Sequence, residues 1–90
     1  MRVIHPTKRP NLSEVHFEDD DNTIVVFSYE TPIAFYTDSY GWAVTEERFS
    51  ATTSRQQNTY PGVRLSPTAF AARLPRHYLR HVRFTSQATR

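Results

Sequence analysis

The residues best suited to chemistry lie in a short polar segment, residues 52–58, with the sequence TTSRQQN. Thr53, Ser54 and Arg55 place hydroxyl groups and a guanidinium at the predicted start of a helix, where free backbone N–H groups and the helix dipole favour an anion. They are candidate ligands for a phosphate or a carboxylate. The same segment also fits a purely structural cap, with Ser54 as N-cap and Gln57 three residues later. Both interpretations stay open, and the structural cap is favoured because such caps are common.

A second group of candidates is defined by charge. The net charge is +2, but residues 51–90 contain seven arginines, no lysine and no acidic residue, whereas all nine acidic residues lie between positions 14 and 47. Arginine favours bidentate and stacking contacts with phosphates and bases. The basic half could instead dock on the acidic half of the same chain. The candidate residues for binding nucleic acid or another partner are Arg73, Arg76, Arg80 and Arg83, which share one arc of the surface if residues 75–84 are helical.

Sequence motifs of the common enzyme classes are missing. Glycine occurs only at positions 41 and 62, which rules out a glycine-rich phosphate loop, and no hydrolase triad motif or HExxH motif is present. His77 and His81 have the spacing of two metal ligands on a helix, but Tyr78 stands where a metalloprotease has glutamate, and no third ligand is evident. Surface or structural histidines are the favoured interpretation. We expect no enzyme activity, no metal and no cofactor.

Two other patterns favour structural roles. The acidic run Asp19–Asp21 lacks the spaced ligands and the central glycine of a calcium loop, and it is typical of a hairpin turn. Tyr29, Phe35 and Tyr36 could stack nucleobases on an exposed sheet face, but in a thin domain such aromatic residues more often belong to the core. The chain has no cysteine, which excludes disulfides and thiolate metal sites and fits a reducing cytoplasm.

The elements that must position these residues are mainly strands. Residues 24–27 and 33–36 form unbroken apolar runs typical of central strands, with a turn or bulge at Pro32 between them. Residues 14–19 alternate as a half-exposed strand, and a further alternating pattern begins at Trp42, changes phase near residues 46–47 and ends at residues 52–54. The expected fold is an α+β domain with a small antiparallel sheet of three to five strands and one or two short C-terminal helices. Its expected core residues are Val25, Phe27, Phe35, Trp42 and Phe49.

Two helices and three chain segments complete the expected organisation. A short, polar helix begins at Ser54 and is closed by residues 61–62, and a second has Ser66 as N-cap and Pro67 as its first residue, with Phe70 and Leu74 on its inner face. Residues 75–84 fit either a helix or a strand, and helix is weakly favoured. Residues 1–12 form an extended arm in which residues 3 and 4 could pair at a sheet edge, residues 13–84 form the single domain, and residues 85–90 form a frayed tail.

Two motifs resemble a known family. The segment VVFSYETPIAFYT followed by FSATTSRQQNTY is similar to short, uncharacterised proteins of bacteriophages and bacterial mobile elements, which have SYxTPxA and TTSRxxN segments. The resemblance covers about residues 23–60. Gln56 stands where that family often has histidine, which argues against an acid/base or metal role at this position. The resemblance implies a phage or mobile-element origin and brings no established activity.

Together these patterns predict a non-enzymatic accessory protein in the cytoplasm of a bacterial host cell. Its arginine-rich C-terminal half would bind an anionic partner, with nucleic acid as the first expectation. The alternative is a protein–protein interaction module that acts on a host protein or self-assembles. No apolar run approaches the length of a membrane span, so no membrane association is expected.

Overall fold

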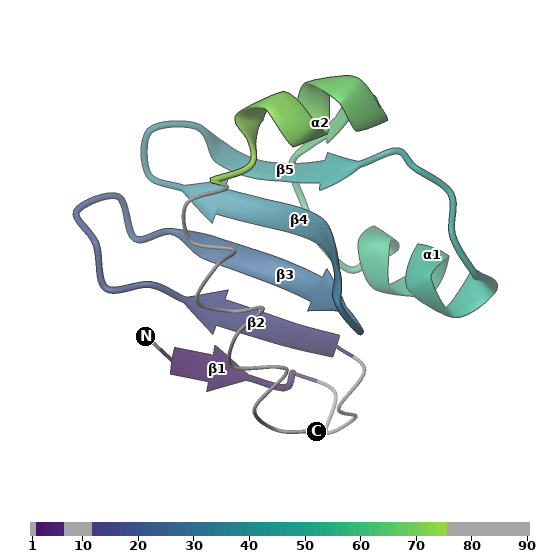
Figure 1. The fold of residues 1–90 in the computed structure, drawn as a ribbon, viewed down its shortest axis with the longest axis horizontal. Helices are drawn as coiled ribbons and strands as arrows, with labels where there is room; N and C mark the ends of the chain where they lie inside the picture. Colours follow the sequence, from purple (N-terminus) through teal and green to yellow (C-terminus); the bar gives the residue numbers. More distant parts are fainter. Residues whose placement is uncertain (1, 7–11, 76–90) are drawn as a thin grey trace.

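The chain folds around one mixed sheet (Figure 1), seen in a computed structural model that describes residues 2–6 and 12–75. The sheet has six strands in the order β1-β2-β3-β4-β5-β6, and two short helices accompany it. Neighbouring strands are antiparallel except β5 and β6, which are parallel. The strands are β1 (Arg2–Ile4), β2 (Leu12–His16), β3 (Ile24–Ser28), β4 (Thr31–Thr37), β5 (Gly41–Thr45) and β6 (Val63–Leu65).

The expected α+β fold with an antiparallel sheet of three to five strands is therefore wrong. The described part of the chain is mostly sheet, and its sixth strand pairs in parallel. The two outer strands, β1 and β6, have only three residues each, which is too short for an alternating pattern to stand out. The suggested pairing of Val3 and Ile4 at a sheet edge is confirmed, since they pair with Val15 and Glu14 of β2.

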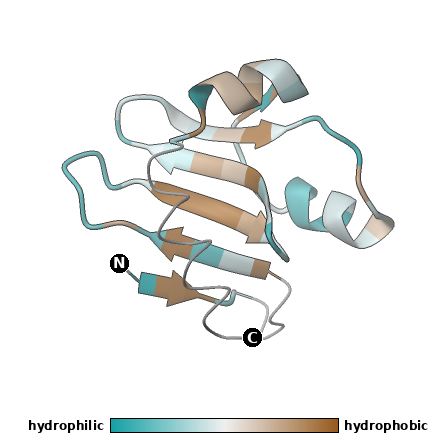
Figure 2. Cartoon of the chain, viewed as in Figure 1, coloured by the Kyte–Doolittle hydropathy of each residue, from teal (hydrophilic) through white to brown (hydrophobic). Residues whose placement is uncertain are grey.

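The two apolar runs form the centre of the sheet, as predicted. In β3, Val25 and Val26 are fully buried on opposite faces, and in β4 the same holds for Ile33 and Phe35. A strand covered on both faces needs no polar alternation. The register shifts between Val26 and Phe27, beside Pro32, and this confirms the irregularity expected at the proline. Hydropathy colouring shows β3 as the most continuous hydrophobic strand (Figure 2).

Helix α2 (Pro67–Arg73) covers one face of the sheet and confirms the predicted second helix. Ser66 is its N-cap, accepting a hydrogen bond from the backbone N–H of Ala69, and proline opens its first turn. Phe70 and Leu74 pack into a core cluster with Phe35, and the ring centroids of Phe70 and Phe35 are 5.5 Å apart. The rest of this cluster comes from the same face of the sheet: Val15, Phe17, Val25, Phe27 and Ala43.

Helix α1 (Ala51–Asn58) lies beside the ends of β3 and β5 in Figure 1 and belongs to the crossover that makes β6 parallel to β5. Its N-cap is Ser50, whose hydroxyl accepts from the backbone N–H of Thr53, so the predicted start at Ser54 is wrong by one turn. Gln57 then faces inward and donates to the backbone oxygens of Thr45 and Glu47, which holds the loop against the helix. The polar character of the helix is confirmed (Figure 2).

Two expectations for the β5 region are corrected. The strand ends at Thr45 rather than continuing to residues 52–54, and residues 46–50 form a loop. Phe49 was expected in the core but lies in this loop and is 37% exposed, because no strand carries it inward. Trp42 is half-buried on the face opposite α2. Val25, Phe27 and Phe35 are buried as predicted.

No helix in the described part of the chain is long and apolar enough to cross a membrane. The expected tail, residues 85–90, and the ambiguous segment 75–84 lie outside the described residues except for Pro75.

Candidate functional site

Three aromatic rings form a row on the sheet face opposite α2. Tyr36 of β4 and Trp42 of β5 are directly paired across the two strands, so their side chains share this face. Tyr60, which follows α1, packs next to Trp42. The ring centroids of Tyr36 and Trp42 are 5.4 Å apart, and so are those of Trp42 and Tyr60, with the planes tilted by 49° and 40°. Tyr36 and Trp42 are half-buried, whereas Tyr60 is buried. The row is therefore most accessible at its Tyr36 and Trp42 members.

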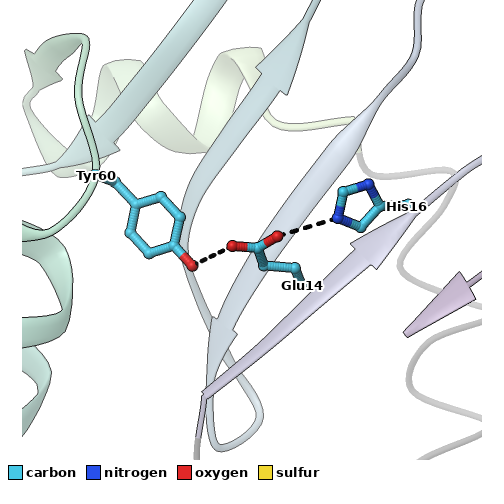
Figure 3. A network of polar contacts seen from close by, with 3 residues as sticks. All are labelled: Glu14, His16 and Tyr60. Atoms are coloured by element: carbon cyan, nitrogen blue, oxygen red, sulfur yellow. Dashed lines mark hydrogen bonds and ion pairs between the residues drawn. The ribbon is translucent and has the colours of Figure 1, made fainter. Parts of the chain in front are cut away.

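At one end of the row, Tyr60 reaches a carboxylate on β2 (Figure 3). Its hydroxyl donates a hydrogen bond of 2.6 Å to Glu14 Oε2. His16 Nε2 lies 3.0 Å from Glu14 Oε1, a contact that becomes an ion pair when the imidazole is protonated. Glu14 and His16 lie two residues apart on one strand, so both side chains point to the same face. The three residues form one network across the sheet.

The Tyr60 network is suited to holding groups in place rather than to proton transfer. Burial raises the pKa of the Tyr60 phenol well above its usual range, and the hydrogen bond to Glu14 and the negative charge of Glu14 raise it further. The phenol therefore stays a hydrogen-bond donor at neutral pH. Both oxygens of Glu14 are already engaged, and no nucleophilic side chain belongs to the network. Its chemical effect is to fix the position of the Tyr60 ring beside Trp42.

At the other end of the row, Tyr36 is bonded to a second carboxylate. Its hydroxyl donates to Asp38 Oδ1 at 2.7 Å, and the Asn22 amide donates to Asp38 Oδ2 at 2.6 Å. These two hydrogen bonds, Tyr36 first, lower the pKa of Asp38 below its usual range, and the same contact raises the pKa of the Tyr36 phenol. Asp38 is therefore a carboxylate at neutral pH.

Asp38 is held in position because two turns are joined by hydrogen bonds. Asp21, in the β2–β3 turn, accepts from the backbone N–H and the hydroxyl of Ser39 at 2.9 and 2.6 Å, and the backbone N–H of Asp38 donates to the Asp21 carbonyl. Asp19, in the same turn, accepts from the backbone N–H and hydroxyl of Thr23. The acidic run thus forms the predicted turn. In residues 2–6 and 12–75, no group of three histidine or acidic side chains is arranged to hold a metal ion.

The predicted anion site lies inside α1 rather than at its start. Thr53 is buried, and its hydroxyl contacts the hydroxyls of Ser28 and Ser50 at 3.0 and 3.2 Å. The backbone N–H of Ser54 donates within the helix to the Ser50 carbonyl. An anion would therefore meet only the half-buried Ser54 side chain and the exposed guanidinium of Arg55. Thr53 acts as a packing residue between the helix and β3.

Of the four predicted partner-binding arginines, the structure places Arg73. Its guanidinium lies over the ring of Tyr40, 4.7 Å from the centroid, at the end of α2. Arg76, Arg80 and Arg83 lie outside the described residues. The proposed stacking aromatics are not brought together: Phe35 is buried under α2, Tyr36 lies on the other face, and Tyr29 is 67% exposed at the β3–β4 turn.

Sequence reasoning missed the aromatic row as a site. Tyr60 and Glu14 are separated by 46 positions, and nothing local in the sequence links them. A usable signal existed only for Tyr36 and Trp42, which are placed opposite each other once residues 38–41 are recognised as a turn.

The comparisons with known proteins identify a family and no function. Residues 6–71 match the model of a family of unknown function, DUF8033. No curated protein and no solved structure shows a significant match to the chain.

Proposed function

Since the chain belongs to the DUF8033 family, whose function is unknown, its role must be inferred from its own residues, and we propose that it is a non-enzymatic module that binds nucleic acid through its arginine-rich C-terminal half. The part of this half that is described consists of α1, β6 and α2. The resemblance of the SYxTPxA and TTSRxxN segments to phage and mobile-element proteins supports an accessory role in the cytoplasm of a bacterial host cell.

The observation that carries the proposal is that the described arginines of this half are exposed and unneutralised. Arg55, Arg64 and Arg73 are all exposed, and none lies within ion-pair distance of a carboxylate in the described part of the chain. Arg64 donates to the Tyr60 carbonyl, and Arg73 lies over Tyr40. Internal docking of the basic half on the acidic half thus has no support from these three residues. Their charge is available to an external polyanion.

The kind of cation favours nucleic acid over a simple anionic surface. All seven positive charges after residue 50 are arginines. A guanidinium can bind a phosphate with two parallel hydrogen bonds and can also stack on a base, whereas lysine offers only a point charge. The proposed contact residues are Arg73, Arg76, Arg80 and Arg83, and an additional phosphate could bind at Ser54 and Arg55.

The test measures affinity for fluorescently labelled DNA and RNA oligonucleotides by anisotropy over a range of salt concentrations. Replacing Arg73 and Arg80 with glutamine should lower the melting temperature only slightly, through loss of the contact between Arg73 and Tyr40. It should weaken binding and reduce the salt slope by about 0.9 for each lost phosphate contact on duplex DNA. The matched control replaces Arg2 and Arg48, two arginines outside the basic half, with glutamine. This control should change the affinity and the salt slope little. No affinity of the parent protein for DNA or RNA at low salt would refute the proposal.

A second candidate function is protein–protein interaction through a sheet edge. β1 and β6 are the outer strands of the described sheet, and each has a well-exposed valine, Val3 at 45% and Val63 at 49%. An open strand edge is a template for pairing with another chain. A pull-down from bacterial lysate with and without nuclease separates the two candidates, because only a protein partner persists after nuclease treatment. Light scattering of the purified protein would detect self-assembly.

A further inference from the structure

We propose that Tyr36, Trp42 and Asp38 form a recognition site for an arginine side chain of a partner polypeptide. The site lies on the sheet face opposite α2, and it is negatively charged, whereas the basic half is positively charged. The proposal does not depend on nucleic-acid binding. Three features of the described residues carry the inference: the paired rings, the ionised carboxylate at their edge, and the arrangement of the other charges on this face.

The two rings offer a surface that suits a cation. Tyr36 and Trp42 are half-buried, with centroids 5.4 Å apart and planes tilted by 49°. A guanidinium placed over a tyrosine or tryptophan ring is attracted by its negative face, and the planar group also stacks on the ring. The described part of the chain contains a contact of this kind, where the Arg73 guanidinium lies 4.7 Å from the ring centroid of Tyr40.

The carboxylate beside the rings gives the site a negative charge. Asp38 is exposed, it accepts a hydrogen bond from the Tyr36 hydroxyl, and it is fixed by a second hydrogen bond from Asn22 in the neighbouring turn. Because the only O–H of the Tyr36 phenol is already used in the hydrogen bond to Asp38, these two side chains present oxygen acceptors and no free hydroxyl donor. Such a pair suits a ligand rich in N–H donors and disfavours a phosphate. Asp21, in the adjoining turn, adds to the negative field around Tyr36.

Among the described residues, the cations on the same face do not neutralise this end of it. By strand register, Arg2 pairs with His16, and Arg64 pairs with Val44, so both arginines share the face. Arg2 lies on β1, three strands away from Tyr36 on β4. The guanidinium of Arg64 is bound to the Tyr60 carbonyl, at the far end of the aromatic row. His16 is paired with Glu14. The site therefore offers one carboxylate, Asp38, beside the two rings, and it suits a single cation better than a series of cations.

A polypeptide is the occupant that fits this setting. The two rings are half-buried, so a free amine or guanidine would be only partly surrounded and would gain little binding energy. An extended peptide that places one arginine at the rings can also cover the half-buried Ile24, which pairs with Tyr36 on the neighbouring strand.

Trp42 makes the experiment direct, because it is the only tryptophan in the chain and its fluorescence reports from within the site. The full chain is titrated with three synthetic peptides of identical glycine and serine spacing that carry one arginine, one lysine or one glutamine. We expect a saturable change in emission with the arginine peptide, about threefold weaker binding of the lysine peptide, and no saturation with the glutamine peptide.

Variants assign the effect to the site. Asp38→Asn, which keeps an acceptor for Tyr36, should weaken the arginine peptide about fivefold, and Tyr36→Leu should abolish binding. Glu46→Gln is the matched control, because it removes one charge from an exposed residue beyond the opposite end of β5, and it should have no effect. Equal binding of arginine and glutamine peptides, or equal losses in Asp38→Asn and Glu46→Gln with the melting temperature unchanged, would overturn the proposal. Nucleic-acid binding should be unaltered in Asp38→Asn, so the two proposals fail independently.

Discussion

Removing the hydroxyl of Tyr60 should lower the free energy of unfolding by about 1–2 kcal/mol. A hydrogen bond to a charged group contributes about 1.5–3 kcal/mol when both partners are buried. The Tyr60 hydroxyl donates to Glu14 Oε2 over 2.6 Å, and Tyr60 is only 8% exposed. The Glu14 side chain keeps 19% of its surface exposed, so water can partly replace the lost donor, which reduces the expected loss. In Tyr60→Phe the ring and its contact with Trp42 are retained, so no cavity term is added.

The measurement is urea unfolding of the parent and of Tyr60→Phe, followed by the fluorescence of Trp42, whose ring centroid is 5.4 Å from that of Tyr60. Tyr40→Phe is the control, because Tyr40 is 40% exposed and has no hydroxyl hydrogen bond within the described part of the chain. It should change stability by less than about 0.5 kcal/mol. A double-mutant cycle with Glu14→Ala, which removes the acceptor, should recover most of the Tyr60→Phe loss as coupling energy.

The pH dependence gives a second test with a fixed sign. Because the folded-state pKa of Tyr60 is raised above the unfolded value of 10.0, its stabilising contribution is fully present below pH 10 and is lost as the pH rises through the folded-state pKa. The stability advantage of the parent over Tyr60→Phe should therefore be constant from neutral pH to about pH 9 and shrink above about pH 10. A loss below about 0.3 kcal/mol in Tyr60→Phe, or no coupling to Glu14, would refute the reasoning.

Three further predictions, on five substitutions, test the packing of the fold by thermal or urea unfolding. Phe27→Ala should cost about 3–5 kcal/mol because the ring is 5% exposed, whereas Phe49→Ala, in the exposed loop, should cost less than about 1 kcal/mol; equal costs would contradict the core assignment. Gly62→Ala should cost more than Gly41→Ala, since both have positive φ but only at Gly62 would a Cβ overlap a β5 backbone carbonyl, and the reverse order would contradict this. Tyr29→Asn should stabilise by about 0.5–1 kcal/mol, because the exposed Tyr29 has φ 55°, and a loss of stability would show that its ring makes an important contact.

The centre of the fold could be predicted from the sequence because its signals are local. The apolar runs around Val25 and Phe35 are long enough to mark strands buried on both faces, and Ser66 followed by proline marks the start of α2. β6 could not be predicted in this way. Its three residues acquire a sheet partner only through the crossover after β5, and that pairing is not encoded in any local period.

The errors near α1 have a different cause. Ser50 and Ser54 are both chemically suitable N-caps. The helix that begins after Ser50 is held by hydrogen bonds from Gln57 to the backbone oxygens of Thr45 and Glu47, and these contacts form only in the folded chain. That information is tertiary. The same applies to the candidate site, since the Tyr36 hydroxyl finds Asp38 through local sequence whereas Tyr60 finds Glu14 only in the folded chain.

The topology also sets an order in which the molecule can assemble. Strands β1 to β5 form a meander in which each strand pairs with its predecessor, so its contacts close short loops at low entropic cost. The contact of Tyr60 with Glu14 closes 46 residues and can form only after the crossover has brought α1 back to the sheet. We therefore expect the aromatic row to be completed late in folding. Because that surface exists only in the fully folded chain, any molecule that binds it will shift the folding equilibrium of the whole domain toward the native state.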